Sequence, residues 1–168
     1  LLQKGLYMPL AYTKLERLSL ADHPDYNERW VQDRIIEDPR ILGLGDLSVR
    51  DRERVHPKAG RLDLLLQDKD PESNHRYEVE LQLGETDSSH IIRMLEYWDI
   101  ERKRYPQYEH TAVLVAEDVT SRFLNVLGLF NGAIPLIAIQ MSAFRLGETI
   151  SLAFTTVLSE LTLGLVDE

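Results

Sequence analysis

The chain contains no cysteine among its 168 residues, so it forms no disulfide and offers no thiolate to bind zinc or to attack a substrate. It has no uncharged apolar run of about 18 residues, the length that crosses a bilayer, and we expect no membrane partner. The first residues also lack the charged segment, apolar stretch and small-residue cleavage site of a signal peptide. These absences favour a cytoplasmic protein whose chemistry depends on carboxylates, histidine, serine or the backbone.

Basic residues are scarce as well: 19 Lys and Arg against 28 Asp and Glu give a net charge of −9. Proteins that coat nucleic acid nonspecifically are usually basic, so this class is disfavoured. A local excess remains between Val49 and Arg61, where five basic residues and His56 accompany two acidic ones. A second cluster, Arg102 to Arg104, is typical of a helix C-terminus, where cations are stabilised by the helix dipole.

The common nucleotide-binding and nucleophile motifs are missing too. No Walker loop is present, and the two glycines of LGLGDL (residues 42–47) do not open a helix as a dinucleotide fingerprint does. Ser88 and Ser89 are not part of a Gly-x-Ser-x-Gly elbow. His56 and His110 are too far apart in the sequence to indicate a zinc pattern.

What the sequence does have is a polar row within the apolar strand Arg76–Leu83, RYEVELQL. Side chains two residues apart share a face of a strand, so Glu78, Glu80 and Gln82 point one way between apolar neighbours. The preceding predicted strand carries Asp63 in the sequence GRLD. Carboxylates on one side of two neighbouring strands are what a hard cation would use.

The remaining pattern predicts one α/β domain over residues 25–158, between an N-terminal arm (1–24) with room for one short helix and a C-terminal tail (159–168). Apolar strands after the later helices indicate parallel crossovers with both sheet faces covered, whereas the first two strands form an antiparallel hairpin. We therefore expect a three-layer αβα fold with a central mixed sheet. The expected helices run from Asn27 to before Pro39, from Asp87 or Ser88 to before Pro106, and from Thr120 to Phe130; the expected strands are 44–54, 61–67, 76–83 (ended by Gly84), 111–116, 134–141 and 149–158.

In chain order, Glu28, the GRLD sequence and the sequence Glu80-Leu81-Gln82 resemble the PD-(D/E)xK nuclease superfamily, most closely its RecB-like and NucS-like DNA-repair branches. Two helix patterns extend this resemblance, which runs from Glu28 to Met141. The first is Glu, two aliphatic residues and Pro; the second is a pair four residues apart, usually Gln and Tyr. In this chain the two patterns are Glu28, Val31, Ile35 and Pro39, and Arg93 and Tyr97.

The resemblance implies a restriction endonuclease-like fold and a DNA nuclease that depends on Mg²⁺, with Mn²⁺ as a substitute. Asp63 and Glu80 are the expected oxygen ligands, completed by the backbone carbonyl of Leu81, and Glu28 is expected to reach the metal directly or through water. The ion would bind a phosphate oxygen and lower the pKa of the attacking water. Glu78 is a reserve ligand. Alternatively, it forms an ion pair with a nearby Arg and has no role in the site.

Five residues are expected to contact nucleic acid: Arg61, Arg93, His90, Lys58 and Tyr97. The alternative for His90 is a solvated side chain. Tyr97 is alternatively a core residue, and the core is also the simplest place for Trp30 and Trp98. We further expect that a homodimer can form.

Gln82 stands where the superfamily usually has Lys, so it is the expected catalytic position that departs from the pattern. A Lys would supply a positive charge, whereas Gln is neutral; Arg61 or Arg93 could provide the charge instead. An alternative is therefore a catalytically weakened nuclease-fold module that binds nucleic acid or a protein partner. A third interpretation is an unrelated α/β domain in which Glu28, Asp63 and Glu80 do not converge.

Overall fold

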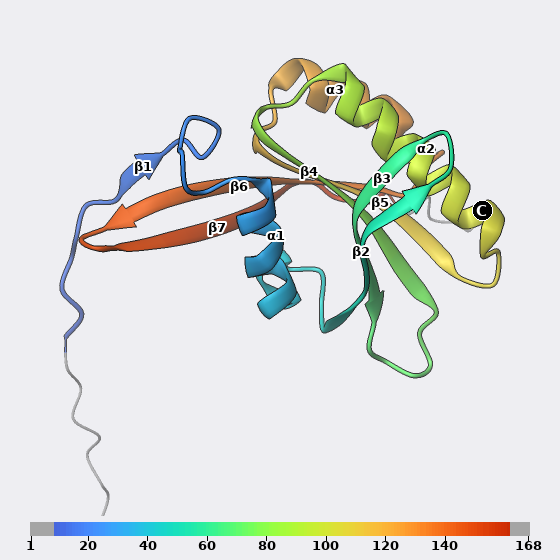
Figure 1. Cartoon of the computed structure of the whole chain (residues 1–168), viewed down its shortest axis with the longest axis horizontal. Coiled ribbons are helices and arrows are strands. Elements are labelled where there is room, and N and C mark those ends of the chain that lie inside the picture. The colour runs from blue at the N-terminus through green and yellow to red at the C-terminus, as the bar shows by residue number, and fades with distance from the viewer. Residues whose placement is uncertain (1–8, 162–168) are drawn as a thin grey trace, which may run out of the picture.

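A computed structural model describes residues 9–161, so residues 1–8 of the predicted arm and 162–168 of the predicted tail lie outside the described part. Seven strands form one sheet in the order β1-β6-β5-β4-β3-β2, with β7 paired to β6 (Figure 1). The strands are β1 (Glu16–Leu18), β2 (Leu47–His56), β3 (Gly60–Asp68), β4 (His75–Glu85), β5 (Glu109–Asp118), β6 (Leu136–Leu146) and β7 (Thr149–Leu158). The helices are α1 (Glu28–Glu37), α2 (Ser88–Arg104) and α3 (Ser121–Phe130), with a 3-10 turn η1 (Pro39–Leu42) after α1.

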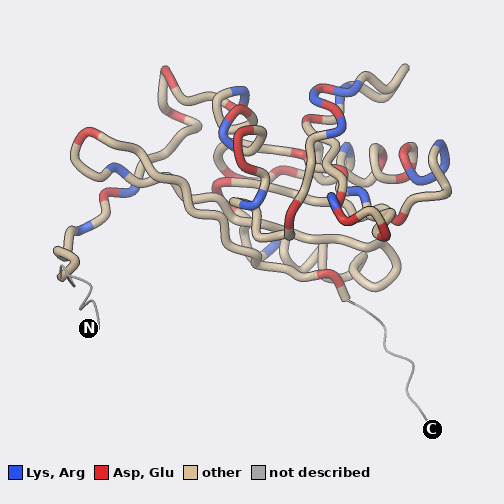
Figure 2. Tube along the Cα trace, turned by 90° about the horizontal axis from the view of Figure 1, so that it is seen from below, with Lys and Arg blue, Asp and Glu red and all other residues tan. Residues whose placement is uncertain are grey.

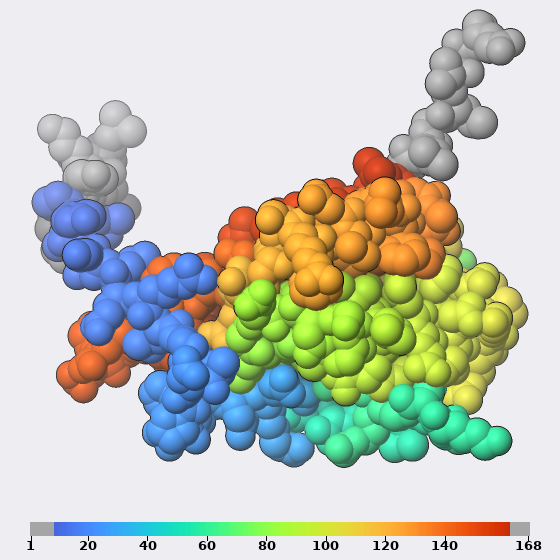
Figure 3. All heavy atoms as spheres, turned by 90° about the horizontal axis from the view of Figure 1, so that it is seen from above, coloured from blue at the N-terminus to red at the C-terminus, as the bar shows by residue number. Residues whose placement is uncertain are grey.

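The sheet is mixed, as the apolar pattern predicts. β4, β5 and β6 are parallel and are joined by crossovers through α2 and α3, whereas β2–β3, β3–β4 and β6–β7 are antiparallel. Figure 1 shows α2 and α3 on one face of the sheet and α1 on the other. Figure 3 looks onto the first face, where the yellow-green atoms of α2 and the orange atoms of α3 lie next to each other. The three-layer αβα fold is thus confirmed.

Each sheet face buries its own apolar cluster, which is why helices cover both sides. Val31 and Ile35 of α1 pack on the face that includes Leu64, Leu81 and Val115. Ile91 and Met94 of α2 and Leu127 of α3 pack on the opposite face. Ile92, which helical spacing assigns to the buried side of α2, is in fact exposed, and Met94 and Tyr97 occupy that side instead.

The predicted starts of the three helices are confirmed, and in α1 and α2 a side chain caps the helix, whereas the N-cap residue of α3, Thr120, makes no side-chain hydrogen bond. The Asn27 side chain accepts a hydrogen bond from the Trp30 N–H at 3.0 Å, and the Asp87 side chain accepts one from the His90 N–H at 3.0 Å. Both are N-cap contacts that satisfy a free amide in the first turn of a helix. They fix where Glu28 and His90 enter their helices.

Two predicted features of the backbone are wrong. Within residues 9–24 the structure has no helix; it has the short strand β1, which pairs with residues 143–145 of β6. Gly84 does not end β4 but lies inside it at a positive φ of 74°, where the register with β5 shifts. Glycine tolerates this conformation, so the strand bulges and continues to Glu85.

The bulge at Gly84 is held by Glu117 of β5, which also fastens the chain before α1. The buried Glu117 carboxylate accepts hydrogen bonds from three backbone N–H groups: Leu20 at 2.6 Å, Ala21 at 3.0 Å and Gly84 at 2.6 Å. Segments far apart in the sequence therefore meet at one side chain. Among the described residues, no helix combines the length and hydrophobicity needed to span a membrane.

Candidate active site

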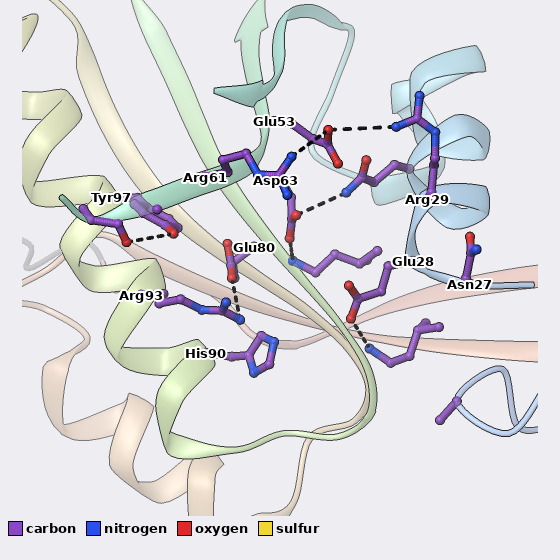
Figure 4. Close-up of a pocket in the computed structure, with 16 residues that line it drawn as sticks. Asn27, Glu28, Arg29, Glu53, Arg61, Asp63, Glu80, His90, Arg93 and Tyr97 are labelled. Carbon is purple, nitrogen blue, oxygen red and sulfur yellow. Dashed lines mark hydrogen bonds and ion pairs between the residues drawn. The ribbon is translucent and has the colours of Figure 1, made fainter. Parts of the chain in front are cut away.

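The candidate site is a cleft of about 710 Å³ between α1, the β2–β3 hairpin, β4 and the first half of α2 (Figure 4). It brings together Glu28 from the start of α1, Asp63 from β3 and Glu80 from β4. Leu81 also lines it. The expected ligands thus share one cavity although they come from three separate elements.

Asp63 lies where β3 and β4 separate. The last backbone pair between these strands is Leu64 with Val79. Beyond it, the Asp63 carboxylate accepts a hydrogen bond from the Leu81 N–H at 2.8 Å. A side chain therefore takes the place of a ladder carbonyl, which keeps the Leu81 amide satisfied and fixes the carboxylate beside β4.

Gln32 of α1 holds the other oxygen of Asp63. Its Nε2 donates to Asp63 Oδ1 at 3.1 Å, and its Oε1 accepts from Arg52 Nε at 2.8 Å. Arg52 is in turn paired with Asp33 at 2.7 Å and donates to the carbonyl of Arg29. Gln32 was not among the predicted site residues; its one signal in the sequence is its position four residues after Glu28, which places both side chains on one face of a helix.

Glu80 is the most deeply placed carboxylate of the cleft, with 2% of the residue exposed. Its Oε1 is paired with the Arg93 guanidinium of α2 at 3.2 Å. Its Oε2 is buried and has no hydrogen-bond partner among the described residues. A buried oxygen without a donor is disfavoured unless another group satisfies it.

The carboxylates disfavour one another's charge. Burial, and then the charge of Asp63, raise the pKa of Glu80 to about 8, against the lowering effect of Arg93. Burial likewise raises the pKa of Asp63 to about 6, with Glu28 adding to the rise and the Leu81 hydrogen bond opposing it. Glu28 itself accepts from the Leu83 N–H at 3.4 Å. Negative charges crowded into a buried cleft are typical of a site that binds a cation.

The donor set suits a hard divalent cation in chemistry: carboxylate oxygens, one of them unpartnered, around one cavity. Within residues 9–161, however, no three His, Asp or Glu side chains already lie close enough together to hold an ion. The site therefore fits a divalent cation in the type of its donor atoms, whereas the donors are not yet arranged around one point. Asp63 and Glu80 are the groups that would hold the ion, with Glu28 at the edge of the cleft.

Glu78 and Gln82 share the strand face with Glu80 but lie outside the cleft lining. Glu78 is fully buried and bonds His110 Nδ1 at 2.6 Å, while His110 Nε2 lies 3.0 Å from the carbonyl oxygen of Tyr105. Gln82 bonds the turn between β4 and α2. The three polar residues on this strand face therefore have different surroundings, and of the three only Glu80 lines the cleft.

The five residues expected to contact nucleic acid are placed differently. Arg61, Arg93 and His90 line the cleft, and Figure 4 shows them around its carboxylates. Lys58 is exposed in the β2–β3 turn and does not line it. Tyr97 is 1% exposed and stacks on His56 at 5.4 Å between ring centres, so it presents no open face to a base.

Arg29, which the sequence analysis did not single out, joins Arg61 at the rim. Both guanidinium groups approach Glu53 Oε2, Arg29 at 3.9 Å and Arg61 at 3.4 Å. Basic and acidic positions otherwise alternate along the chain without a large region of one sign (Figure 2). The cleft itself mixes both signs, with Arg29, Arg61 and Arg93 beside its carboxylates.

No known family model matches the sequence, and no curated protein matches it either. A solved structure does match: the crystal structure of a repair endonuclease from Pyrococcus abyssi, with 21% sequence identity and a TM-score of 0.55. The match covers 71% of this chain and 49% of that one, so it spans about half the length of the endonuclease chain. The chain therefore shares the α/β three-layer fold of that structure, with a mixed central sheet between helices.

Proposed function

We propose that this chain is a metal-dependent nuclease that hydrolyses phosphodiester bonds of DNA, with Mg²⁺ as its cofactor. One observation carries the proposal: Glu80 is buried in the cleft beside Asp63, with a raised pKa and an oxygen that has no hydrogen-bond partner within residues 9–161. A bound cation would stabilise the charged form of such a carboxylate and satisfy its unpaired oxygen. The similarity in fold to a repair endonuclease supports the same reaction class.

Different residues of the cleft bind the ion and orient its ligands. Asp63 and Glu80 bind the ion, and Glu28 contributes directly or through water from the edge of the cleft. Gln32 orients Asp63 through its hydrogen bond at 3.1 Å. When bound, the divalent cation supplies activation of water and neutralisation of charge on the phosphate.

DNA is the proposed partner because exposed arginines lie at the rim of the cleft, next to its carboxylates. The side chains of Arg29 and Arg61 are mostly exposed, and both approach the same carboxylate, that of Glu53. Guanidinium groups bind phosphate oxygens with two parallel hydrogen bonds. If Arg29 and Arg61 bind phosphates, binding is expected to weaken with added salt, because those contacts release counterions from the DNA.

The test incubates the protein with supercoiled, linear, single-stranded and branched DNA in Mg²⁺, in Mn²⁺ and in chelator, beside Asp63→Ala and Glu80→Ala. Cleavage is expected in either metal, and it is expected to be lost in chelator and in both variants. Cleavage that survives both substitutions would point to a contaminant and remove the proposal. DNA binding without cleavage would favour the alternative, a catalytically weakened nuclease-fold module.

A further inference from the structure

Gln82 is fully engaged in the turn that joins β4 to α2. Its Nε2 donates to the Glu85 carbonyl at 2.8 Å and to Asp87 Oδ2 at 3.3 Å, and its Oε1 accepts from the Asp87 N–H at 3.1 Å. The residue is 6% exposed and does not line the cleft. Its side chain therefore fastens the N-cap of α2 and does not reach a substrate in the cleft.

Arg93 occupies the place from which a positive charge can act. It extends from α2 into the cleft, where its guanidinium lies 3.2 Å from Glu80 Oε1, and 42% of its side chain is exposed (Figure 4). The other two arginines of the cleft, Arg29 and Arg61, are paired at the rim with Glu53. Among the described residues that line the cleft, Arg93 is the arginine paired with Glu80.

We propose that Arg93 is a catalytic residue, which supplies from α2 the positive charge that position 82 of β4 lacks. The inference rests on the proposed nuclease activity. In hydrolysis, the oxygen of water bonds to phosphorus and the bond from phosphorus to the leaving oxygen breaks with its electron pair. One proton of the water ends on the leaving oxygen, and the other is released to solvent. Arg93 exchanges no proton, because a guanidinium stays charged; it stabilises the negative charge that grows on the phosphate oxygens.

The test compares Arg93→Ala and Arg93→Lys with the wild-type protein on the DNA that the wild type cleaves fastest. Arg93→Ala is expected to lower kcat about 100-fold, the usual effect of removing one donor to a developing oxyanion. Arg93→Lys, which keeps the charge, is expected to recover part of that loss. Arg93→Lys, which keeps a positive charge beside Glu80, is expected to keep the Kd for DNA in Ca²⁺ and the binding of Mn²⁺, measured by calorimetry, close to the wild-type values.

Arg102→Ala is the matched control: Arg102 lies on the same helix, is 48% exposed and is paired with Asp99 outside the cleft. It is expected to leave kcat unchanged. Gln82→Lys is expected to bring no gain in kcat and to lower the Tm of the metal-free protein, because the α2 N-cap loses its partner. A wild-type rate for Arg93→Ala, or a rise in kcat of tenfold or more for Gln82→Lys, would overturn the inference and leave the proposed function intact. A wild-type protein that binds Mn²⁺ but cleaves none of the DNAs would overturn both.

Discussion

Each polar side chain on the α2 side of β4 has its own partner, and the partner determines what the side chain can do. Glu78 is hydrogen-bonded to His110, Gln82 is held by the Asp87 turn, and Glu80 lies beside Arg93 with one oxygen that has no partner among the described residues. Period-two alternation places all three on one face without distinguishing them. The chemistry of the site is therefore decided by the residues opposite the strand.

The hydrogen bond from Gln32 to Asp63 is testable at this scale. Gln32→Leu is expected to leave Asp63 Oδ1 unpaired and the carboxylate held at one oxygen only. The looser carboxylate is expected to lower kcat about tenfold, which corresponds to about 1.4 kcal/mol of transition-state stabilisation. The measurement is the cleavage rate at saturating DNA. Gln67→Leu is the control, because Gln67 bonds Arg76 and does not line the cleft. Equal rates for Gln32→Leu and the wild type would show that the Leu81 N–H alone positions Asp63.

Among the elements, the β2–β3 hairpin and α2 both line the cleft, and they approach each other closely at Gly60. Gly60 begins β3 at a positive φ of 121°, and a Cβ there would lie 2.5 Å from the Tyr97 hydroxyl. Tyr97 is itself buried against Leu62 and Leu65 of β3. The hairpin can approach α2 this closely only because residue 60 has no side chain.

Gly60→Ala is expected to destabilise the protein by about 1–3 kcal/mol, because it adds both a strained φ and a clash. Urea unfolding measures this change. Gly128→Ala in α3 is the matched control: nothing lies near its Cβ position, and the change is expected to stabilise the helix by up to about 1 kcal/mol. A Gly60→Ala protein as stable as the wild type would mean that the hairpin moves away from α2 at little cost.

The order and type of the elements from α1 to β7 follow from the sequence, because capping residues and long apolar strands are local signals. The extent of β4 does not follow from the sequence, because a glycine that ends a strand cannot be distinguished in the sequence from one that forms a bulge within it. Asp63 and Glu80 are predictable as polar residues in apolar strands. Gln32 is not, because a glutamine on a helix does not reveal that its partner comes from β3. The burial of Tyr97 depends on Gly60, a contact between residues 37 positions apart.

At the scale of the whole molecule, the carboxylate cluster lowers the stability of the metal-free protein. Folding places Asp63 and Glu80 where burial and mutual repulsion disfavour their charged forms. Both pKa values are raised above the values of 3.8 and 4.5 expected for the unfolded chain. The stabilising effect of the protonated forms is therefore complete below about pH 4 and is lost as the pH rises through about 6 and about 8.

The Tm of the metal-free protein is accordingly expected to fall between about pH 5 and pH 8.5, by an amount that reflects a few kcal/mol of unfolding free energy. Thermal unfolding in chelator, followed by circular dichroism, measures it. Glu80→Gln is expected to flatten this dependence and raise the Tm near pH 8, and the difference isolates Glu80 from other titrating groups such as His56. Millimolar Mg²⁺ is expected to raise the wild-type Tm most at the alkaline end. A Tm that rises with pH in chelator would contradict the raised pKa values.

The three amides bound by Glu117 also have a practical consequence for how the chain is handled. Leu20 and Ala21 lie in the predicted N-terminal arm, outside the predicted domain, yet they share one carboxylate with the bulge next to the cleft. A shortened protein prepared for crystallisation, or a fusion joined at residue 25, would leave that carboxylate with a single donor and loosen Gly84. The safe place to cut is before Glu16, where β1 begins.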